Sequence, residues 1–207
     1  MSDPLLQRIR DRALAVPGAY GLFKKLIGAG KDRSVFAREH VRAKDGDRVL
    51  DIGCGTADVL SFLPRVEYTG FDPSAEYIAT ATARYGDRAK FYCQRVSEQS
   101  LVVHHDFDIV LAQGVLHHLD DAEARRLFRL AHAALKPGGR LVTLDGVYVP
   151  GQSRVARLLL SRDRGKFVRH EQGYRELAEG VFDDVGSAVR HDLLNIPYTL
   201  LVLDCTK

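Results

Sequence analysis

Two acidic residues and a pair of glycines in the first half of the chain stand where they could bind a small ligand. Gly53 and Gly55 come directly after the apolar run 49–52, which is typical of a strand buried on both faces. Glycines at that place let the backbone turn sharply and leave no Cβ in the way of a ligand. Asp72 lies roughly 20 residues further on, the spacing at which a doubly wound fold places an acid that accepts hydrogen bonds from ribose hydroxyls. Asp51, at the mouth of the turn, favours an amino group on the ligand over a pyrophosphate.

A second group of side chains could move a proton. His117 and His118 follow the apolar stretch 107–112, and histidine is well suited to acid–base work near neutral pH. Further candidates for a catalytic base are Tyr148, His170 and Asp145. The alternative for the histidine pair is a packing role. We expect no metal site, because adjacent histidines point apart on a strand and no helical His-x-x-x-His spacing occurs.

Strands and helices alternate along the chain and would hold these residues together. After the run 49–52, strands are expected at 66–71, 88–93, 107–112 and 140–147. The intervening segments are long enough for helices, which predicts a parallel sheet covered on both faces. Right-handed crossovers place the carboxyl ends of all these strands on one edge. That edge would bring together Asp51, Asp72, Gln113 and Asp145, as a ligand crevice requires.

The sequence resembles the class I S-adenosylmethionine-dependent methyltransferases, and four segments carry the resemblance. They are Val-Leu-Asp-Ile-Gly-Cys-Gly-Thr at 49–56, Gly-Phe-Asp-Pro-Ser at 70–74, Phe-Asp-Ile-Val-Leu-Ala-Gln-Gly-Val-Leu-His-His-Leu at 107–119 and Leu-Lys-Pro-Gly-Gly-Arg-Leu at 135–141. The resemblance is closest to small biosynthetic enzymes of the ubiquinone, menaquinone and natural-product type. It implies an α/β fold with a Rossmann-like, doubly wound sheet of seven strands in the order 3-2-1-4-5-7-6, the last strand being antiparallel. Residues 185–191 and 198–204 would supply the C-terminal hairpin.

The resemblance also implies S-adenosyl-L-methionine as the methyl donor, S-adenosyl-L-homocysteine as the product and no metal. Asp51 would bind the methionine ammonium directly or through water, and Asp72 would take the ribose hydroxyls. The full set expected to contact the cofactor is Asp51, Gly53, Cys54, Gly55, Asp72, Pro73, Val96 and Gln113. Arg95 departs from the family, which usually has an Asp there to hold the adenine amino group. The adenine would then be held by backbone near Val96, by Glu98 or by stacking on an apolar residue.

A single domain is expected over residues 1–207, because the chain shows no linker and no internal repeat. Its parts would be an N-terminal helical lid at 1–44, a cofactor-binding core at 45–149, a substrate-side insert at 150–182 and a C-terminal β-hairpin at 183–207. In similar proteins such N-terminal helices lie across the ligand cleft. Tyr20, Phe23 and Phe36 are therefore candidates for substrate contact, with packing against the sheet as the alternative.

The insert is rich in basic residues. Between residues 154 and 175 they are Arg154, Arg157, Arg162, Arg164, Lys166, Arg169 and Arg175, against the acids Asp163 and Glu171. Because the insert follows the fifth strand, we expect it beside the cleft. Arg164, Arg169 and His170 are candidates for binding a carboxylate or phosphate of the substrate, to which arginine is well suited. The alternative is a solvated charged loop.

Composition limits the partners. The formal net charge of +3 is mild, so it does not favour a nucleic-acid partner. No apolar run is long enough to span a membrane, and we expect no secretory signal. Three scattered cysteines favour reduced thiols in the cytoplasm over a disulfide framework. A monomer or a homodimer fits these properties.

We therefore expect a cytoplasmic enzyme that moves a methyl group by direct in-line transfer to O, N or C of a small-molecule metabolite, including anionic ones. Two alternatives stay open. One is a non-catalytic module that binds S-adenosylmethionine or S-adenosylhomocysteine, which Arg95 favours. The other is a methyltransferase that acts on RNA or protein, supported only by the basic insert.

Overall fold

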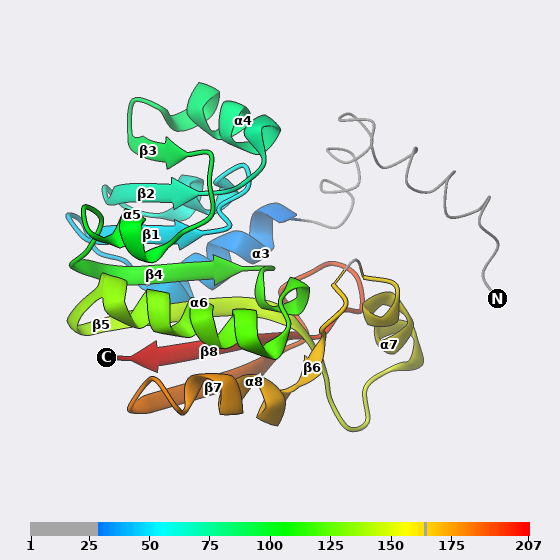
Figure 1. The fold of residues 1–207 in the computed structure, drawn as a ribbon. Helices are drawn as coiled ribbons and strands as arrows, with labels where there is room; N and C mark the ends of the chain where they lie inside the picture. Colours follow the sequence, from blue (N-terminus) through cyan, green and yellow to red (C-terminus); the bar gives the residue numbers. More distant parts are fainter. Residues whose placement is uncertain (1–28, 164) are drawn as a thin grey trace.

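The computed structural model describes residues 29–163 and 165–207, and one mixed sheet forms its centre (Figure 1). The strands are β1 (Arg48–Ile52), β2 (Glu67–Phe71), β3 (Ala89–Tyr92), β4 (Phe107–Gln113), β5 (Leu135–Tyr148), β6 (Arg169–His170), β7 (Asp184–Arg190) and β8 (Leu200–Thr206). Their order is β3-β2-β1-β4-β5-β8-β7, with β6 paired to β5 outside this path. The first five strands are parallel and β8 is antiparallel to both its neighbours. The predicted Rossmann-like order and antiparallel last strand are confirmed, and β6 is an addition to them.

Both faces of the sheet are covered, because consecutive strand residues point to opposite sides. Val49 packs in one apolar cluster with Phe36 and Leu60, while its neighbour Leu50 packs in a second cluster with Phe128. Helices of the first face are α3 (Ala29–Phe36), the π-helix η1 (Ala37–Val41), the 3-10 helix η2 (Asp58–Phe62) and α4 (Ala75–Tyr85). Helices of the second are α5 (Glu98–Leu101), α6 (Asp121–Ala134) and α8 (Glu171–Ala178). The 3-10 turn η3 (Leu116–His118) follows β4, and α7 (Arg154–Ser161) follows β5.

Local sequence sets where several helices begin. The Ser74 side chain accepts a hydrogen bond from the backbone N–H of Tyr77 at the start of α4, and Asp120 does the same for Glu123 at the start of α6. Serine and aspartate are among the residue types preferred at helix N-caps.

The helix expected after the first strand is different. The segment between the first two strands was expected to form a full helix, but Ala57 adopts a left-handed conformation with φ 52° and only the short 3-10 helix η2 follows. Leu63 is extended, as a residue before a proline tends to be. The segment after the glycine turn is therefore compact rather than a full α-helix.

Boundaries of the last strands also differ from the expectation. β5 begins at Leu135 rather than Arg140, and its pairing with β4 shifts register between Phe107 and Ile109. The C-terminal hairpin is present, displaced by one or two residues from the predicted ranges 185–191 and 198–204. Most of the expected N-terminal lid lies outside the described residues, as do Tyr20, Phe23 and Arg164.

Candidate active site

One cavity of about 1100 Å³ lies along the carboxyl ends of the parallel strands. Of the residues expected from the sequence to contact a ligand, it is lined by Phe36, Gly53, Gly55, Asp72, Pro73, Val96, Gln113, His117, His118 and Asp145. Apart from Phe36, which lies on α3, these residues stand at the ends of, or directly after, five different strands, β1 to β5, as the topology predicted. The topological switch point of an open α/β sheet is where such folds bind their ligands.

The glycine turn after β1 opens onto this cavity. Gly53 and Gly55 both have positive φ, at 75° and 52°. A Cβ on Gly53 would lie 2.6 Å from Cγ2 of Val115, so only glycine fits there. No heavy atom lies within 4 Å of a Cβ position on Gly55 among the described residues, so this side of the turn faces open space. The backbone can therefore come close to a ligand, as the sequence predicted.

Asp72, directly after β2, is hydrogen-bonded to the same glycine turn. Its Oδ2 accepts a hydrogen bond from the Gly55 N–H at 3.0 Å, and its Oδ1 accepts one from the Ser74 N–H at 2.8 Å. Each carboxylate oxygen can accept a further hydrogen bond, and Asp72 lines the cavity. The carboxylate is thus fixed in place with capacity left for two adjacent hydroxyls.

Asp51 and Cys54 are buried beside the glycine turn and are not among the residues that line the cavity. Only 1% of Asp51 is exposed, and its Oδ2 accepts a hydrogen bond from the Tyr68 hydroxyl at 2.5 Å. Burial raises the pKa of Asp51 to about 7, and Oδ1 has no hydrogen-bond partner within the described residues. The Cys54 sulfur packs against Gly70, where a Cβ would lie only 2.8 Å from Sγ. Neither side chain lines the cavity, unlike the other residues of the glycine turn.

The region expected to hold adenine contains Arg95 and Val96, and both line the cavity. The Arg95 guanidinium is largely exposed and lies 3.7 Å from the Glu123 carboxylate. Glu98, the polar alternative for holding adenine, accepts two hydrogen bonds from Arg126, at 3.2 and 2.7 Å. These bonds lower the pKa of Glu98 to about 2. Since Arg126 engages Glu98, the apolar Val96 and nearby backbone are the better remaining candidates.

At the other end of the cavity, His117 lies between two carboxylates. Its Nδ1 is 2.7 Å from Oδ1 of Asp145, and its Nε2 is 3.5 Å from Oδ1 of Asp163. The backbone N–H of His117 also donates to Asp145 Oδ1, at 3.2 Å. The Tyr198 hydroxyl in turn donates to Asp163 Oδ2, at 2.6 Å. All four side chains line the cavity, and the 3.5 Å contact between His117 and Asp163 joins the two hydrogen-bonded pairs into one cluster.

Opposing effects set the protonation of this cluster. Burial disfavours the charged form of His117 and lowers its pKa. The hydrogen bond and negative charge of Asp145, and the charge of Asp163, favour the charged form. Together they outweigh burial and raise the histidine pKa above its ordinary value. Burial raises the pKa of Asp145 as well, against the opposing effect of His117. Asp145 fixes the histidine ring through Nδ1, which leaves Nε2 directed toward Asp163 and the cavity.

Two glycines let neighbouring segments approach this cluster. A Cβ on Gly165 would lie 2.0 Å from Cδ2 of His117, and the Phe167 N–H donates to the His117 carbonyl at 3.0 Å. A Cβ on Gly146 would lie 2.9 Å from the Tyr198 hydroxyl. Close packing at both positions holds the histidine and the tyrosine in place.

Sequence reasoning missed Asp163 and Tyr198. Asp163 stands among basic residues of the insert and was counted only as a charge, while Tyr198 was read only as the start of the last strand. Their separations from His117 in the chain follow no regular spacing. The available signal was an isolated acid in a basic segment next to the cleft.

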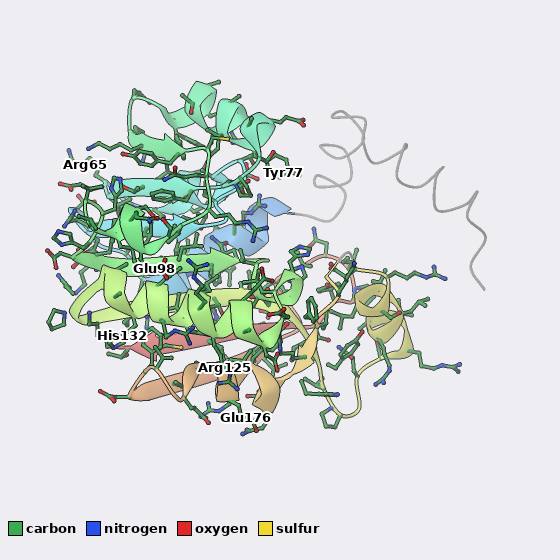
Figure 2. All side chains as sticks on the ribbon, in the orientation of Figure 1. Arg65, Tyr77, Glu98, Arg125, His132 and Glu176 are labelled. Carbon is green, nitrogen blue, oxygen red and sulfur yellow. The ribbon has the colours of Figure 1, made fainter. Side chains whose placement is uncertain are left out.

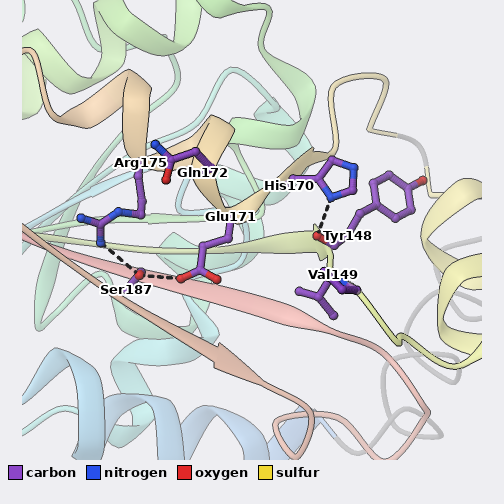
Figure 3. A pocket seen from close by; sticks show the side chains of 8 residues that line it. Tyr148, Val149, His170, Glu171, Gln172, Arg175 and Ser187 are labelled. Carbon is purple, nitrogen blue, oxygen red and sulfur yellow. Dashed lines mark hydrogen bonds between the residues drawn. The ribbon is translucent and has the colours of Figure 1, made fainter.

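Tyr148 and His170 do not line the large cavity. They line a separate hollow of about 540 Å³ with Glu171, Arg175 and Ser187 (Figure 3). The His170 Nδ1–H donates to the Tyr148 carbonyl at 2.9 Å, and Ser187 donates to Glu171 at 2.7 Å. In this hollow, His170 and Ser187 therefore already donate hydrogen bonds to neighbouring groups.

Arg169 does not provide the expected anion site. Its guanidinium donates to Oδ1 of Asp121, to the carbonyls of Leu116 and Leu119, and to the carbonyl of Phe167. With its donors engaged in this way, Arg169 fixes the loop that carries the histidines. Arg162 is the arginine of the insert that lines the cavity.

Comparison with known proteins agrees with this geometry. Residues 49–139 match the family model described as a methyltransferase domain. The chain is 29% identical over 184 residues to a ubiquinone/menaquinone biosynthesis C-methyltransferase of Methylococcus capsulatus, covering 81% of this chain and 73% of the relative. These matches support a class I S-adenosylmethionine-dependent methyltransferase.

Two other relatives extend the range of this methyltransferase family. A 27-O-demethylrifamycin SV methyltransferase of Amycolatopsis mediterranei is 33% identical over 51% of this chain and 40% of the relative. A phosphoethanolamine N-methyltransferase 2 of Haemonchus contortus, solved in complex with S-adenosyl-L-methionine, superposes with a TM-score of 0.72 at 17% identity, covering 95% of this chain and 58% of that one. The chain spans 24% to 63% of the length of further curated relatives that it matches.

In the part of the chain that the structure describes, no group of three or more His, Cys, Asp or Glu residues is arranged to hold a metal ion. Every helix in residues 29–163 and 165–207 is too short or too polar to cross a bilayer.

Proposed function

We propose that this methyltransferase moves a methyl group from S-adenosyl-L-methionine to a small-molecule acceptor. One observation carries the proposal: the same cavity contains the glycine turn with Asp72 and, further along, the cluster of His117 and Asp145. The first set suits a nucleoside with vicinal hydroxyls, and the second suits a group that must lose a proton.

Binding of the donor rests on Asp72 and on the turn at Gly53 and Gly55. Asp72 keeps acceptor capacity for the ribose hydroxyls, and the open side of Gly55 allows close approach of the sugar. Val96 and Pro73 would contact the adenine, and Gln113 also lines the cavity. The bound cofactor supplies an electrophilic methyl carbon. Contact of Asp51 with the methionine ammonium stays a prediction, and the unpartnered Oδ1 of Asp51 is its support.

On the acceptor side, we propose His117 as the base. Asp145 holds Nδ1, so Nε2 is the nitrogen that would accept a proton from the acceptor. His118 lies with its ring centroid 4.1 Å from that of His117 and lines the cavity, so it would contact the acceptor. Holding donor and acceptor at attack distance can by itself be worth about 7 to 11 kcal/mol.

The acceptor would be a metabolite with an apolar body. The cavity wall contains the aliphatic side chains Leu144, Leu159, Leu193, Leu194 and Ile196, together with Arg162. Arg162 takes the role first assigned to Arg164 and Arg169, that of pairing with a negative group on the acceptor. The named relatives include C-, N- and O-methyltransferases, so the methylated atom is left open among these three. The free thiols of Cys54, Cys93 and Cys205 support a cytoplasmic location.

Calorimetric titration tests the proposal. S-adenosyl-L-methionine and S-adenosyl-L-homocysteine should bind the purified chain, and Asp72→Ala should weaken both by about 100-fold, since it removes charge-assisted hydrogen bonds to the ribose. Asp87→Ala, an exposed acid after α4, is the matched control and should bind like the parent. Equal binding by Asp72→Ala and the parent would overturn the assignment of the donor site. Binding without release of S-adenosyl-L-homocysteine across a panel of acceptors would favour the non-catalytic alternative, which Arg95 supports.

A further inference from the structure

Helix α7 has an inner face that is tightly packed and an outer face that is open. Ser153 caps the helix by accepting a hydrogen bond from the Ala156 N–H at 3.1 Å. Ala156 and Leu160 are buried, and Leu160 packs so closely on β5 that a Cβ on Gly146 would lie 2.6 Å from it. These contacts fix the helix on the body of the protein and determine which side chains face outward.

The outer face of α7, defined here as Arg154, Val155, Arg157 and Leu158, combines apolar and basic side chains. Val155 is 54% exposed and Leu158 is 47% exposed, and they lie three residues apart on one side of the helix. Arg154 and Arg157 are exposed beside them, and neither forms an ion pair with any residue that the structure describes. No acidic residue occurs between 154 and 162. The face is thus apolar with a basic border.

This face adjoins the proposed acceptor end of the cavity. The next residues along α7 and its end, Leu159 and Arg162, line the cavity itself. Figure 1 shows α7 beyond the carboxyl ends of the parallel strands, apart from the helices that cover the sheet. A surface that the outer face of α7 contacts would therefore lie next to the cavity.

We propose that the outer face of α7 docks on an anionic lipid bilayer. Aliphatic side chains bordered by arginines match the interface of such a bilayer, where the apolar groups enter the acyl boundary and the guanidinium groups pair with phosphates. A protein partner is less well matched, because two aliphatic side chains are few for an interface that commonly buries about 800 Å² on each partner.

Docking in this place gives the cavity a source of acceptor. An amphiphilic acceptor could pass from the bilayer along Leu159 and Ile196 into the cavity with little exposure of its apolar body to water. This passage of the acceptor from the bilayer into the cavity rests on the proposed function, whereas the docking of α7 on the bilayer does not.

Sedimentation with vesicles tests the docking. The parent protein should sediment with vesicles of phosphatidylcholine and phosphatidylglycerol, should not sediment with phosphatidylcholine alone, and should be released as salt is raised. Val155→Ser with Leu158→Ser, and separately Arg154→Gln with Arg157→Gln, should each lower the partition coefficient about tenfold or more. None of these four side chains lines the cavity, so binding of S-adenosyl-L-methionine should be unchanged.

Two matched controls lie away from α7. Val102→Ser with Val103→Ser removes valines that are 74% and 71% exposed after α5, and Arg65→Gln with Arg88→Gln removes the same charge from exposed positions. Figure 2 labels Arg65 on the side of the molecule opposite α7. Both control pairs should sediment like the parent.

A spectroscopic reporter separates docking from loss of folding. The chain contains no tryptophan, so Leu158→Trp introduces a single one on the outer face, and Val103→Trp introduces one far from it. Anionic vesicles should shift the emission of Leu158→Trp to the blue and leave Val103→Trp unchanged.

Absence of vesicle binding by the parent, or equal binding by the α7 and control variants, would overturn the docking. A concentration-dependent dimer that the α7 variants abolish, with no vesicle binding, would assign this face to a second copy of the chain and equally overturn it. Vesicle binding without binding of S-adenosyl-L-methionine would leave the docking in place and refute the proposed function.

Discussion

The two ends of the cavity are built in different ways. At the donor end, the hydrogen bond from Gly55 to Asp72 joins residues 17 positions apart, within one strand–turn–strand unit. At the acceptor end, His117 and Asp145 are 28 positions apart, and Asp163 and Tyr198 are 35 apart. The donor end is thus fixed by consecutive segments, whereas the acceptor end forms only when β4, β5, the insert and the C-terminal hairpin meet.

This difference suggests a division of roles. A donor site contained in one unit can keep its geometry while the segments of the acceptor end vary, since loops tolerate change better than the scaffold that positions them. The names of two relatives fit this view, because one refers to ubiquinone and menaquinone biosynthesis and the other to a rifamycin. We expect mutations at the two ends to separate donor binding from turnover.

The largest expected effect is at the acceptor end. His117→Gln should lower kcat by about 10² to 10⁴-fold with any acceptor that must lose a proton, because it removes the general base. The affinity for S-adenosyl-L-methionine should change by less than about threefold, since His117 belongs to the other end of the cavity. Single-turnover rates and calorimetry on the same preparation measure the two quantities. A loss of donor affinity as large as the loss of rate would show that the two ends are not separable.

His132→Gln provides the matched control for this prediction. His132 lies on α6 and outside the cavity, with its ring 5.2 Å from that of Phe182 (Figure 2). It should retain both turnover and donor affinity.

The next effect concerns folding at the donor end. The pKa of Asp51 is raised from 3.8 to about 7 by burial, so between these values the folded chain holds a proton that the unfolded chain has released. The free energy of unfolding must therefore fall as pH rises from about 4 to about 7, by an amount on the order of 4 kcal/mol for this group, and then level off.

Asp51→Asn removes this pH dependence and keeps an acceptor for the Tyr68 hydroxyl. Relative to the parent, the variant should gain stability as pH rises from 4 to 8, which urea unfolding at several pH values would measure. Asp87→Asn, an exposed acid, should follow the parent at every pH. A constant stability difference between Asp51→Asn and the parent would mean that Asp51 titrates normally.

The contrast between the ends also explains what could be predicted from the sequence. Gly53, Gly55 and Asp72 were found because a strand, a glycine turn and an acid at a fixed spacing are local features. The parallel sheet followed from the alternation of strands and helices, and the strand order from the family resemblance; both are confirmed. Asp163 and Tyr198 were missed because their proximity to His117 depends on long-range packing.

Errors in the prediction have equally specific causes. The full helix expected between the first two strands is replaced by a short 3-10 helix, which begins after Ala57 in a left-handed conformation that no propensity argument indicated. Arg169 looked like a free cation, but four neighbouring residues engage its guanidinium. The sequence shows the charge of an arginine, but it does not show whether nearby backbone carbonyls without other partners will accept hydrogen bonds from its guanidinium.

The smallest expected effect is a shift in the pH profile of kcat/KM, and it tests most directly how the acceptor end of the cavity differs from the donor end. Asp145 raises the pKa of His117, so the neutral histidine that can accept a proton forms only at higher pH than for an ordinary histidine. Asp145→Asn removes that charge and should move the rising limb of the kcat/KM profile to lower pH, while lowering its plateau because the ring is held less firmly. Asp163→Asn should shift the limb in the same direction but by less, since Asp163 lies 3.5 Å from Nε2 and Asp145 only 2.7 Å from Nδ1. A rising limb that stays in place in both variants would exclude His117 as the titrating group, and the acceptor end would then act by binding and orientation alone.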